Sequence, residues 1–209
     1  MEPTFLAAAV IILLFSVIIH EVAHGFVALK FGDRTALLAG RLTLNPIPHI
    51  DPIGTILLPL LLILSGSPVM LGWAKPVPVN PFNFSNIRKG ELFVSAAGIG
   101  TNFAIAVFAA LILNILRPIF PPLLENILRF TILINLILAI FNSLPIPPLD
   151  GSKILATFLP PHLAQTYAQF ERYGIFILLL LLLIPVGGSS LLGFFLGIIL
   201  SFFQIILRL

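Results

Sequence analysis

The chain of 209 residues contains no cysteine, only 9% charged residues, one tryptophan and two tyrosines. Without cysteine it cannot form a disulfide bond, a thiolate zinc site or a cysteine nucleophile. Soluble domains have roughly a quarter charged residues, so the shortage of charge excludes an ordinary soluble enzyme. Intrinsic disorder is excluded as well, because disordered chains are poor in apolar residues.

Apolar residues are correspondingly frequent and make up 59% of the chain. A soluble fold cannot cover that much apolar surface with so few polar groups. The formal net charge is +3, but the basic residues are scattered, and Arg88 and Lys89 are the only adjacent pair. This scatter argues against a nucleic-acid surface. The composition therefore predicts an integral membrane protein in a lipid bilayer, with no nucleic-acid partner.

Five apolar segments are candidates for membrane-spanning helices. The first, 4–31, has 28 residues, which as a helix would be about 42 Å long, enough for a hydrocarbon core of about 30 Å. The others are 91–116, 123–141, an apolar helix ending near Ile184, and 191–207, the last two joined by a tight hairpin at 185–190. Small residues at 95–100 would let helices approach closely. We expect an all-α polytopic membrane protein with five to six transmembrane helices, in which residues 1–209 form a single domain.

Three segments differ from this pattern. Segment 53–66 is apolar but has only 14 residues and contains Pro59, which suits a re-entrant segment better than a full crossing. Residues 33–52 form a polar connector, in which the alternation at 40–44 predicts a short strand. Residues 67–90 are rich in proline and are expected to be mostly extended loop.

The first apolar segment contains the motif H-E-x-x-H, formed by His20, Glu21 and His24. Histidines four residues apart lie on one face of a helix and can bind the same metal ion. Glu21 is close enough to act on a water molecule bound to that metal. An ionisable group inside a membrane span costs about 3 kcal/mol and rarely persists without a function. The motif therefore predicts a metal site.

A catalytic zinc site normally has three protein ligands and an open position for water. Because the chain has no cysteine, the third ligand must be His, Asp or Glu. Asp150 is the strongest candidate, since it follows the span 123–141 in a proline-rich turn that ends at Gly151. The alternative is that Asp150 only caps the start of a helix over 151–159.

Together these motifs resemble those of the site-2 protease family of intramembrane zinc metalloproteases. The resemblance rests on H-E-x-x-H at 20–24 and on N-x-x-P-x-P-x-x-D-G at 142–151. Between them, A-G-I-G-T-N at 97–102 is similar to the family's Ala-Gly-Pro-x-x-Asn element, with isoleucine where proline is usual. Residues 41–54 and 72–80 resemble the compact prokaryotic branch, which has no PDZ domain.

The resemblance implies zinc bound by His20, His24 and Asp150, with Glu21 as the general base. It implies a multi-pass protein of a prokaryotic inner or plasma membrane. The implied substrates are transmembrane segments of membrane-anchored proteins, cut within or at the edge of the bilayer, as in regulated intramembrane proteolysis. Two alternatives stay open, a metal-ion transporter and a noncatalytic membrane scaffold that binds metal. The sequence indicates neither the particular substrate nor the oligomeric state.

Four other polar residues are weaker candidates. Asn102 and Asn142 lie in or at the ends of predicted spans. Each could bind the substrate backbone or the transition-state oxyanion, or could only tie helices together. His49 and Asp51 could line the site or bind a second metal, or could brace the connector.

The predicted metal site also constrains the topology. The two histidines lie near the end of the first span and Asp150 lies just beyond the span 123–141, so an even number of crossings must separate them. Spans 91–116 and 123–141 supply two crossings. Segment 53–66 is then re-entrant rather than a further span.

The distribution of basic residues agrees with this topology. With 53–66 re-entrant, Arg117 and Arg129 lie on one side, and nine basic residues lie on the other: Lys30, Arg34, Arg41, Lys75, Arg88, Lys89, Lys153, Arg172 and Arg208. Cytoplasmic loops carry the excess of Lys and Arg. The zinc site is therefore expected toward the cytoplasm.

Overall fold

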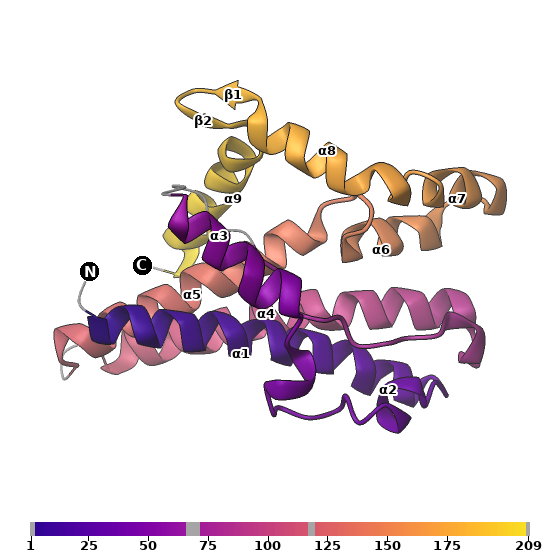
Figure 1. The fold of residues 1–209 in the computed structure, drawn as a ribbon, viewed down its shortest axis with the longest axis horizontal. Helices are drawn as coiled ribbons and strands as arrows, with labels where there is room; N and C mark the ends of the chain where they lie inside the picture. The colour runs from indigo at the N-terminus through magenta and orange to yellow at the C-terminus, as the bar shows by residue number, and fades with distance from the viewer. Residues whose placement is uncertain (1–2, 66–71, 117–119, 208–209) are drawn as a thin grey trace.

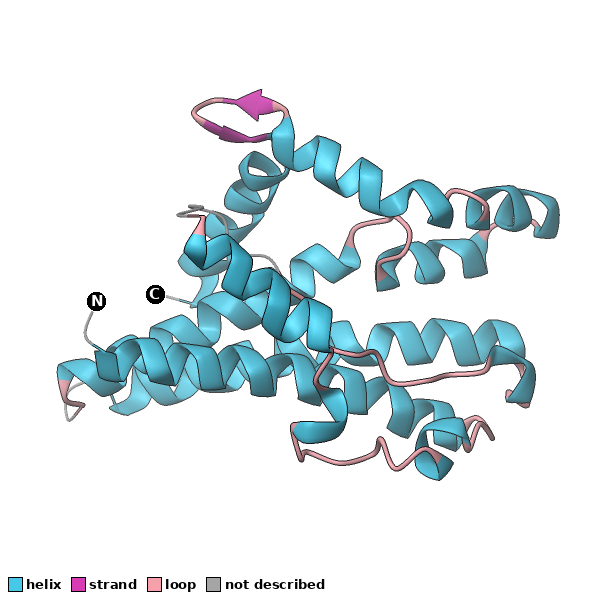
Figure 2. Cartoon of the chain, in the orientation of Figure 1, coloured by secondary structure: helices cyan, strands magenta, loops and turns pink. Residues whose placement is uncertain are grey.

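The computed structural model describes residues 3–65, 72–116 and 120–207, and its regular structure there is almost entirely helical (Figure 2). The longer helices are α1 (Pro3–Lys30), α4 (Ile87–Leu116), α5 (Pro122–Ser143), α6 (Asp150–Phe158), α7 (Pro161–Ala168), α8 (Glu171–Leu183) and α9 (Leu191–Leu207). The shorter ones are α2 (Thr35–Leu38), η1 (Ile47–His49), η2 (Pro52–Leu57), α3 (Leu58–Leu64) and η3 (Pro81–Asn83). Strands β1 (Pro185–Val186) and β2 (Ser189–Ser190) pair antiparallel.

Helices α1, α4 and α5 are long and apolar enough to cross a membrane. They pack against one another, and α9 packs against α5 (Figure 1). Between α4 and α5, the small side chains of Ala106, Ala109 and Ala110 lie in one core cluster with Ile132 and Leu136. Small residues let helix backbones approach closely, which favours association in lipid.

The outward faces of these long helices are apolar. Val10 on α1 and Phe108 and Ile115 on α4 are 60%, 66% and 72% exposed. Large apolar side chains exposed along whole helices are suited to contact with lipid rather than water. The expectation of an all-α polytopic membrane protein is confirmed.

The last helices are shorter than the spans expected from the sequence. Helices α7 and α8 are bent by 62° relative to each other and are long enough to cross only as a pair. Helix α8 has 13 residues and α9 has 17. In the described parts of the chain, three helices reach spanning length, or four if the bent pair is one span. The hairpin expected at 185–190 is present, with Gly187 and Gly188 at positive φ.

Segment 53–66 forms no long helix in its described part. The wide helical turn η2, with 6 residues, continues directly into α3, which has 7 residues, and the two together are about 20 Å long. This length is too short for a hydrocarbon core of about 30 Å. The helix length thus agrees with a re-entrant segment.

The short strand expected at 40–44 is not formed. Gly40 turns the chain at a φ of 65°, and residues 42–44 form bends. No strand in the described part of the chain lies beside them to supply the backbone hydrogen bonds that a sheet needs. The side chain of Arg41 is buried instead, where it donates a hydrogen bond to the Lys75 carbonyl oxygen over 2.6 Å.

Residues 72–80, here called the strap, are extended and lie beside the connector and α1. The backbone N–H groups of Trp73, Lys75 and Val77 donate to oxygen atoms of η2, of the connector and of α1 over 3.1, 2.9 and 2.7 Å, respectively. Alternate residues of an extended chain face the same side. These bonds therefore hold one edge of the strap against the connector and α1.

Candidate metal centre

Helix α1 places His20 and His24 one turn apart on the same face, with their Nε2 atoms 3.0 Å apart. The two residues are only 7% and 8% exposed. In each ring the other nitrogen, Nδ1, faces an oxygen: Asn102 Oδ1 at 2.6 Å for His20 and the Val94 carbonyl at 2.7 Å for His24. Because an acceptor faces each Nδ1, the proton of each neutral ring lies there and Nε2 presents a lone pair.

Asp150 reaches the histidines as the first residue of α6. Its Oδ2 lies 3.2 Å from both Nε2 atoms. No side chain caps the start of α6, so Asp150 does not act as the helix cap considered above. Gly151 allows α6 to begin close to the end of α5, because a Cβ at Gly151 would overlap the carbonyl group of Ser143.

The three converging atoms suit one zinc ion. They are separated by 3.0, 3.2 and 3.2 Å, and tetrahedral ligands at about 2.0–2.1 Å from zinc are about 3.3 Å apart. Asp150 Oδ2 is buried and has no hydrogen-bond donor. The Nε2 lone pairs of the two histidines and Asp150 Oδ2 thus face one another in a buried site. Such a cluster of acceptors is unfavourable unless a cation lies between them. Two imidazoles and one carboxylate form a donor set of catalytic zinc, with the fourth position left open.

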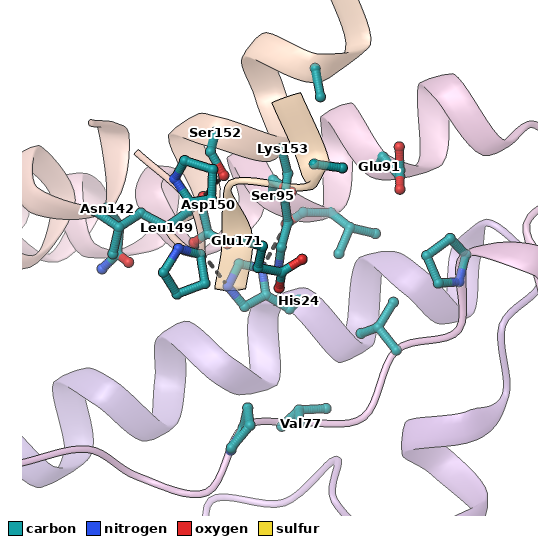
Figure 3. A pocket seen from close by; sticks show the side chains of 18 of the residues that line it. His24, Val77, Glu91, Ser95, Asn142, Leu149, Asp150, Ser152, Lys153 and Glu171 are labelled. Carbon is teal, nitrogen blue, oxygen red and sulfur yellow. Dashed lines mark hydrogen bonds and ion pairs between the residues drawn. The ribbon is translucent and has the colours of Figure 1, made fainter. Parts of the chain in front are cut away.

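A cavity of about 700 Å³ lies in front of the three ligand atoms. Residues of α1, α4, α6, the strap and the α7–α8 region line it. Figure 3 shows Asp150 and His24 facing each other, with Asn142 near Asp150 and Val77 on the strap across from them. The group formed by His20, His24 and Asp150 is therefore buried in the protein except where it faces this cavity.

Glu21 lines the same cavity as the metal group. Its Oε2 accepts a hydrogen bond from the backbone N–H of Val77 over 2.7 Å. Pro76 and Pro78 flank Val77 and have no N–H group. Nothing in the sequence marks Val77 for this contact, because every residue except proline has a backbone N–H group.

The two asparagine candidates lie in different places. Asn142 lines the cavity, and its Nδ2 donates to the Leu138 carbonyl oxygen over 2.9 Å. Asn102 is fully buried beside His20 and is not part of the cavity wall. Its Nδ2 donates to Ser16 O and Asn135 Oδ1, which uses both amide hydrogens. Asn142 thus lies in the cavity wall, whereas Asn102 contacts His20 outside that wall.

His49 and Asp51 lie in the connector and do not line this cavity. His49 is fully buried, with Nε2 2.9 Å from the Thr43 carbonyl oxygen. Asp51 accepts hydrogen bonds from the backbone at the start of η2. Neither residue joins a group of possible metal ligands in the described part of the chain. Their contacts brace the connector.

Gly98 of α4 contributes to the site by having no side chain. A Cβ at Gly98 would lie 2.5 Å from Cε1 of both His20 and His24. The run of small residues at 95–100 predicted close helix packing, but it did not indicate that the packing partners are His20 and His24.

The chain is similar to one known protein family and to several named relatives. The family described as "Peptidase family M50" matches residues 118–185, which include Asp150. A protein of Bacillus subtilis named "Putative zinc metalloprotease YwhC" is 40% identical over 189 residues, covering 87% of this chain and 83% of that protein. "Putative zinc metalloprotease Rip2" of Mycobacterium tuberculosis (H37Rv) is 32% identical over 195 residues, covering 92% of this chain and 71% of that protein. No solved structure is significantly similar to the chain.

Proposed function

Because the chain belongs to Peptidase family M50, we propose that His20, His24 and Asp150 bind its zinc ion and that Glu21 is the general base. Membership of this family makes the chain an intramembrane zinc metalloprotease, a hydrolase that acts on peptide substrates in a membrane environment. The alternatives of a metal-ion transporter and a noncatalytic scaffold are not favoured by the family or by the relatives.

One observation carries the assignment of these residues. The three ligand atoms converge within hydrogen-bonding distances of one another, and Glu21 lines the cavity that opens in front of them. A base must lie near the proton that it accepts, and Glu21 is adjacent to a ligand in the same helix.

The residues divide the work of peptide hydrolysis. When bound, zinc supplies the Lewis acidity that activates water and polarises the scissile carbonyl. Glu21 accepts the proton of the attacking water as the C–O bond forms, and returns it to the amide nitrogen as the C–N bond breaks. The Val77 N–H orients the Glu21 carboxylate. Asn142 uses one amide hydrogen on Leu138 O and donates the other to the substrate backbone.

The substrate that we propose is a transmembrane polypeptide, cut within the bilayer or at its edge. The base and two ligands lie in α1, a helix of spanning length. A substrate helix keeps its carbonyl groups in internal hydrogen bonds when it lies in lipid. It must therefore unwind locally before a peptide bond can enter the cavity.

The location that we propose is a prokaryotic cell membrane, with the zinc site toward the cytoplasm and residues 1–209 acting as one protease domain. The two helices α4 and α5 are both of spanning length, which supports a common side of the membrane for the histidines and Asp150. The excess of basic residues on that side supports its cytoplasmic orientation. The single-domain proposal is supported by the site itself, which combines residues of α1 and α6.

The first test of the proposed function separates the base from the metal. Glu21→Gln keeps the size of the side chain but cannot accept a proton. In proteoliposomes with a model transmembrane helix as substrate, we expect it to lower turnover at least ~100-fold while the zinc content stays at the wild-type value. Wild-type turnover by zinc-loaded Glu21→Gln would exclude Glu21 as the base.

The second test concerns the third ligand. Asp150→Asn should lose zinc and cleavage together, because a neutral amide is a poor zinc ligand. Asp51→Asn is the matched control, since Asp51 is also an aspartate at the start of a helix but lies outside the cavity, and it should keep its zinc. Retention of zinc by Asp150→Asn with loss from Asp51→Asn would move the third ligand into the connector.

A further inference from the structure

Three polar side chains are buried together on the Nδ1 side of His20. Ser16 on α1, Asn102 on α4 and Asn135 on α5 are 4%, 0% and 0% exposed. The three helices that carry them pack against one another. A buried amide in this setting is unfavourable unless its donors and acceptor are all used. The bonds that these side chains make are therefore informative about their role.

The bonds determine which way each amide group points. Asn135 Nδ2 donates to the Thr131 carbonyl oxygen and to Ser16 Oγ, each over 2.9 Å. Asn135 Oδ1 then faces Asn102 and accepts from its Nδ2 over 2.8 Å. The second hydrogen of Asn102 Nδ2 goes to the Ser16 carbonyl oxygen over 3.3 Å. Because backbone carbonyls only accept hydrogen bonds, neither amide can be turned around without losing bonds.

This chain of donors and acceptors ends at a zinc ligand. With its Nδ2 committed, Asn102 can present only Oδ1 to His20 Nδ1, 2.6 Å away. An acceptor at Nδ1 keeps the proton on that nitrogen and leaves the lone pair on Nε2. His24 needs no such side chain, because its Nδ1 faces the Val94 backbone carbonyl. The two histidines are thus oriented by different means.

We propose that Asn135 and Asn102 act as positioning residues that hold His20 in its metal-binding tautomer, by a hydrogen-bond relay that runs from α5 through α4 to α1. This inference rests on the proposed zinc site. Asn102 has the direct contact with the ligand, and Asn135 acts through Asn102. Partners beyond the first ligands commonly change metal affinity by about 10–100-fold when they are removed.

The test compares variants of Asn102 that differ in the acceptor they offer. Asn102→Leu keeps a side chain branched at Cγ with the same number of heavy atoms but offers no acceptor, and it should lower zinc affinity about 10–100-fold in a chelator competition assay. Asn102→Asp still offers an oxygen to His20 Nδ1 and should restore affinity to within about tenfold of wild type. The visible spectrum of the Co²⁺-substituted protein should shift in Asn102→Leu and return toward wild type in Asn102→Asp.

Asn114 provides the matched control on the same helix. Its Nδ2 ties α4 to α9 by a bond to the Leu207 carbonyl oxygen over 2.9 Å, far from the ligands in sequence. Asn114→Leu should lower the unfolding temperature without changing zinc affinity or the Co²⁺ spectrum. If Asn102→Leu and Asn114→Leu behave alike in these two measurements, Asn102 only ties helices together and the relay is wrong.

Two further measurements cover the case in which Asn102→Leu does not fold. Asn135→Leu should lower zinc affinity about tenfold, whereas Asn135→Asp keeps the acceptor for Asn102 and should lower it less. In wild-type protein labelled with ¹⁵N-histidine and loaded with zinc, His20 should show a protonated Nδ1 and a metal-bound Nε2. A metal-bound Nδ1 in His20 would overturn the proposal.

Failure of the relay and failure of the proposed function give different results. If Asp150→Asn loses zinc while the Asn102 and Asn135 variants bind it as wild type does, the zinc site stands and the relay is wrong. If Asp150→Asn keeps its zinc, the assignment of the ligands is wrong.

Discussion

The backbone N–H of Val77 donates a hydrogen bond to Oε2 of Glu21 over 2.7 Å, across 56 residues of sequence. Val77 is the residue of the strap that stands between Pro76 and Pro78, neither of which has an N–H group. The strap is held on the same edge by Lys75, whose N–H donates to the His49 carbonyl oxygen over 2.9 Å. The orientation of the proposed base therefore depends on a segment outside the helix that carries it.

Val77→Pro removes this N–H and should lower turnover about 10–100-fold, since a hydrogen bond to a charged group contributes about 1.5–3 kcal/mol. Proline is compatible with the extended backbone of the strap. Zinc content should not change, because Val77 contacts the proposed base, Glu21, and none of the proposed ligands. Val77→Ala keeps the N–H and is the control, with turnover near that of wild type. Equal losses in the two variants, measured as cleavage in proteoliposomes, would show that the side chain matters and the N–H does not.

Gly98→Ala should displace the imidazoles, because its Cβ would lie 2.5 Å from Cε1 of both His20 and His24. We expect zinc content and cleavage to fall together, and the unfolding temperature to fall as well, because overpacking costs about 1–3 kcal/mol. Gly100→Ala is the control on the same helix, since a Cβ there meets nothing within 4 Å. Elemental analysis of the two purified variants checks the prediction. Full zinc occupancy in Gly98→Ala would mean that α4 can move away from the ligands at little cost.

Asp33 joins the end of α1 to the far end of the strap. It is fully buried, and its carboxylate accepts hydrogen bonds from the Asn80 N–H and from Asn83 Nδ2, each over 2.8 Å. Burial by itself would raise the pKa of the Asp33 carboxyl, but hydrogen bonds from Asn83, Thr35 and Asn80 together lower the pKa below its ordinary value. A carboxyl whose pKa falls on folding stabilises the fold above its unfolded pKa, about 3.9. That contribution is lost as the pH falls through the folded value.

Asp33→Asn should lower the free energy of unfolding by about 1–3 kcal/mol at neutral pH, because it removes charge-assisted hydrogen bonds in a buried site. The difference between wild type and variant should narrow as the pH falls below about 4, where the Asp33 carboxyl of the unfolded wild-type chain begins to take up its proton. Unfolding in detergent micelles, followed by circular dichroism at neutral and acidic pH, measures both effects. A difference that stays constant with pH would exclude the carboxylate charge as the cause.

The proposed orientation predicts which positions can be labelled from each side of the membrane. The absence of cysteine allows single cysteines to be introduced without other changes. Asn86→Cys, before α4, and Lys153→Cys, in α6, should react with an impermeant thiol reagent from the cytoplasm. Pro121→Cys and Ser189→Cys should react from outside. These four positions are exposed, and labelling of Asn86→Cys and Lys153→Cys from opposite sides would contradict the even number of crossings.

Local sequence was sufficient to predict the class of protein and the central motif. The shortage of charge determines that the helices lie in lipid, because no soluble fold can cover so much apolar surface. The common face of His20 and His24 follows from the 3.6-residue helical repeat alone. Asp150 could be named as a candidate third ligand because the turn around it is recognisable in the sequence, with proline before it and Gly151 after it.

The tertiary structure alone decides which groups meet these residues. The bonds from Glu21 to Val77 and from His20 to Asn102 join residues 56 and 82 positions apart. The first uses a backbone N–H, which every residue except proline has, so no residue type marks it in the sequence. The bond between His20 and Asn102 could not be foreseen either, because both Asn102 and Asn142 are asparagines of predicted spans. Only the packed helices enclose Asn102 and leave Asn142 at the cavity. The failed strand at 40–44 has the same cause: alternation is a local property, whereas a strand requires a partner that only the folded chain can bring beside it.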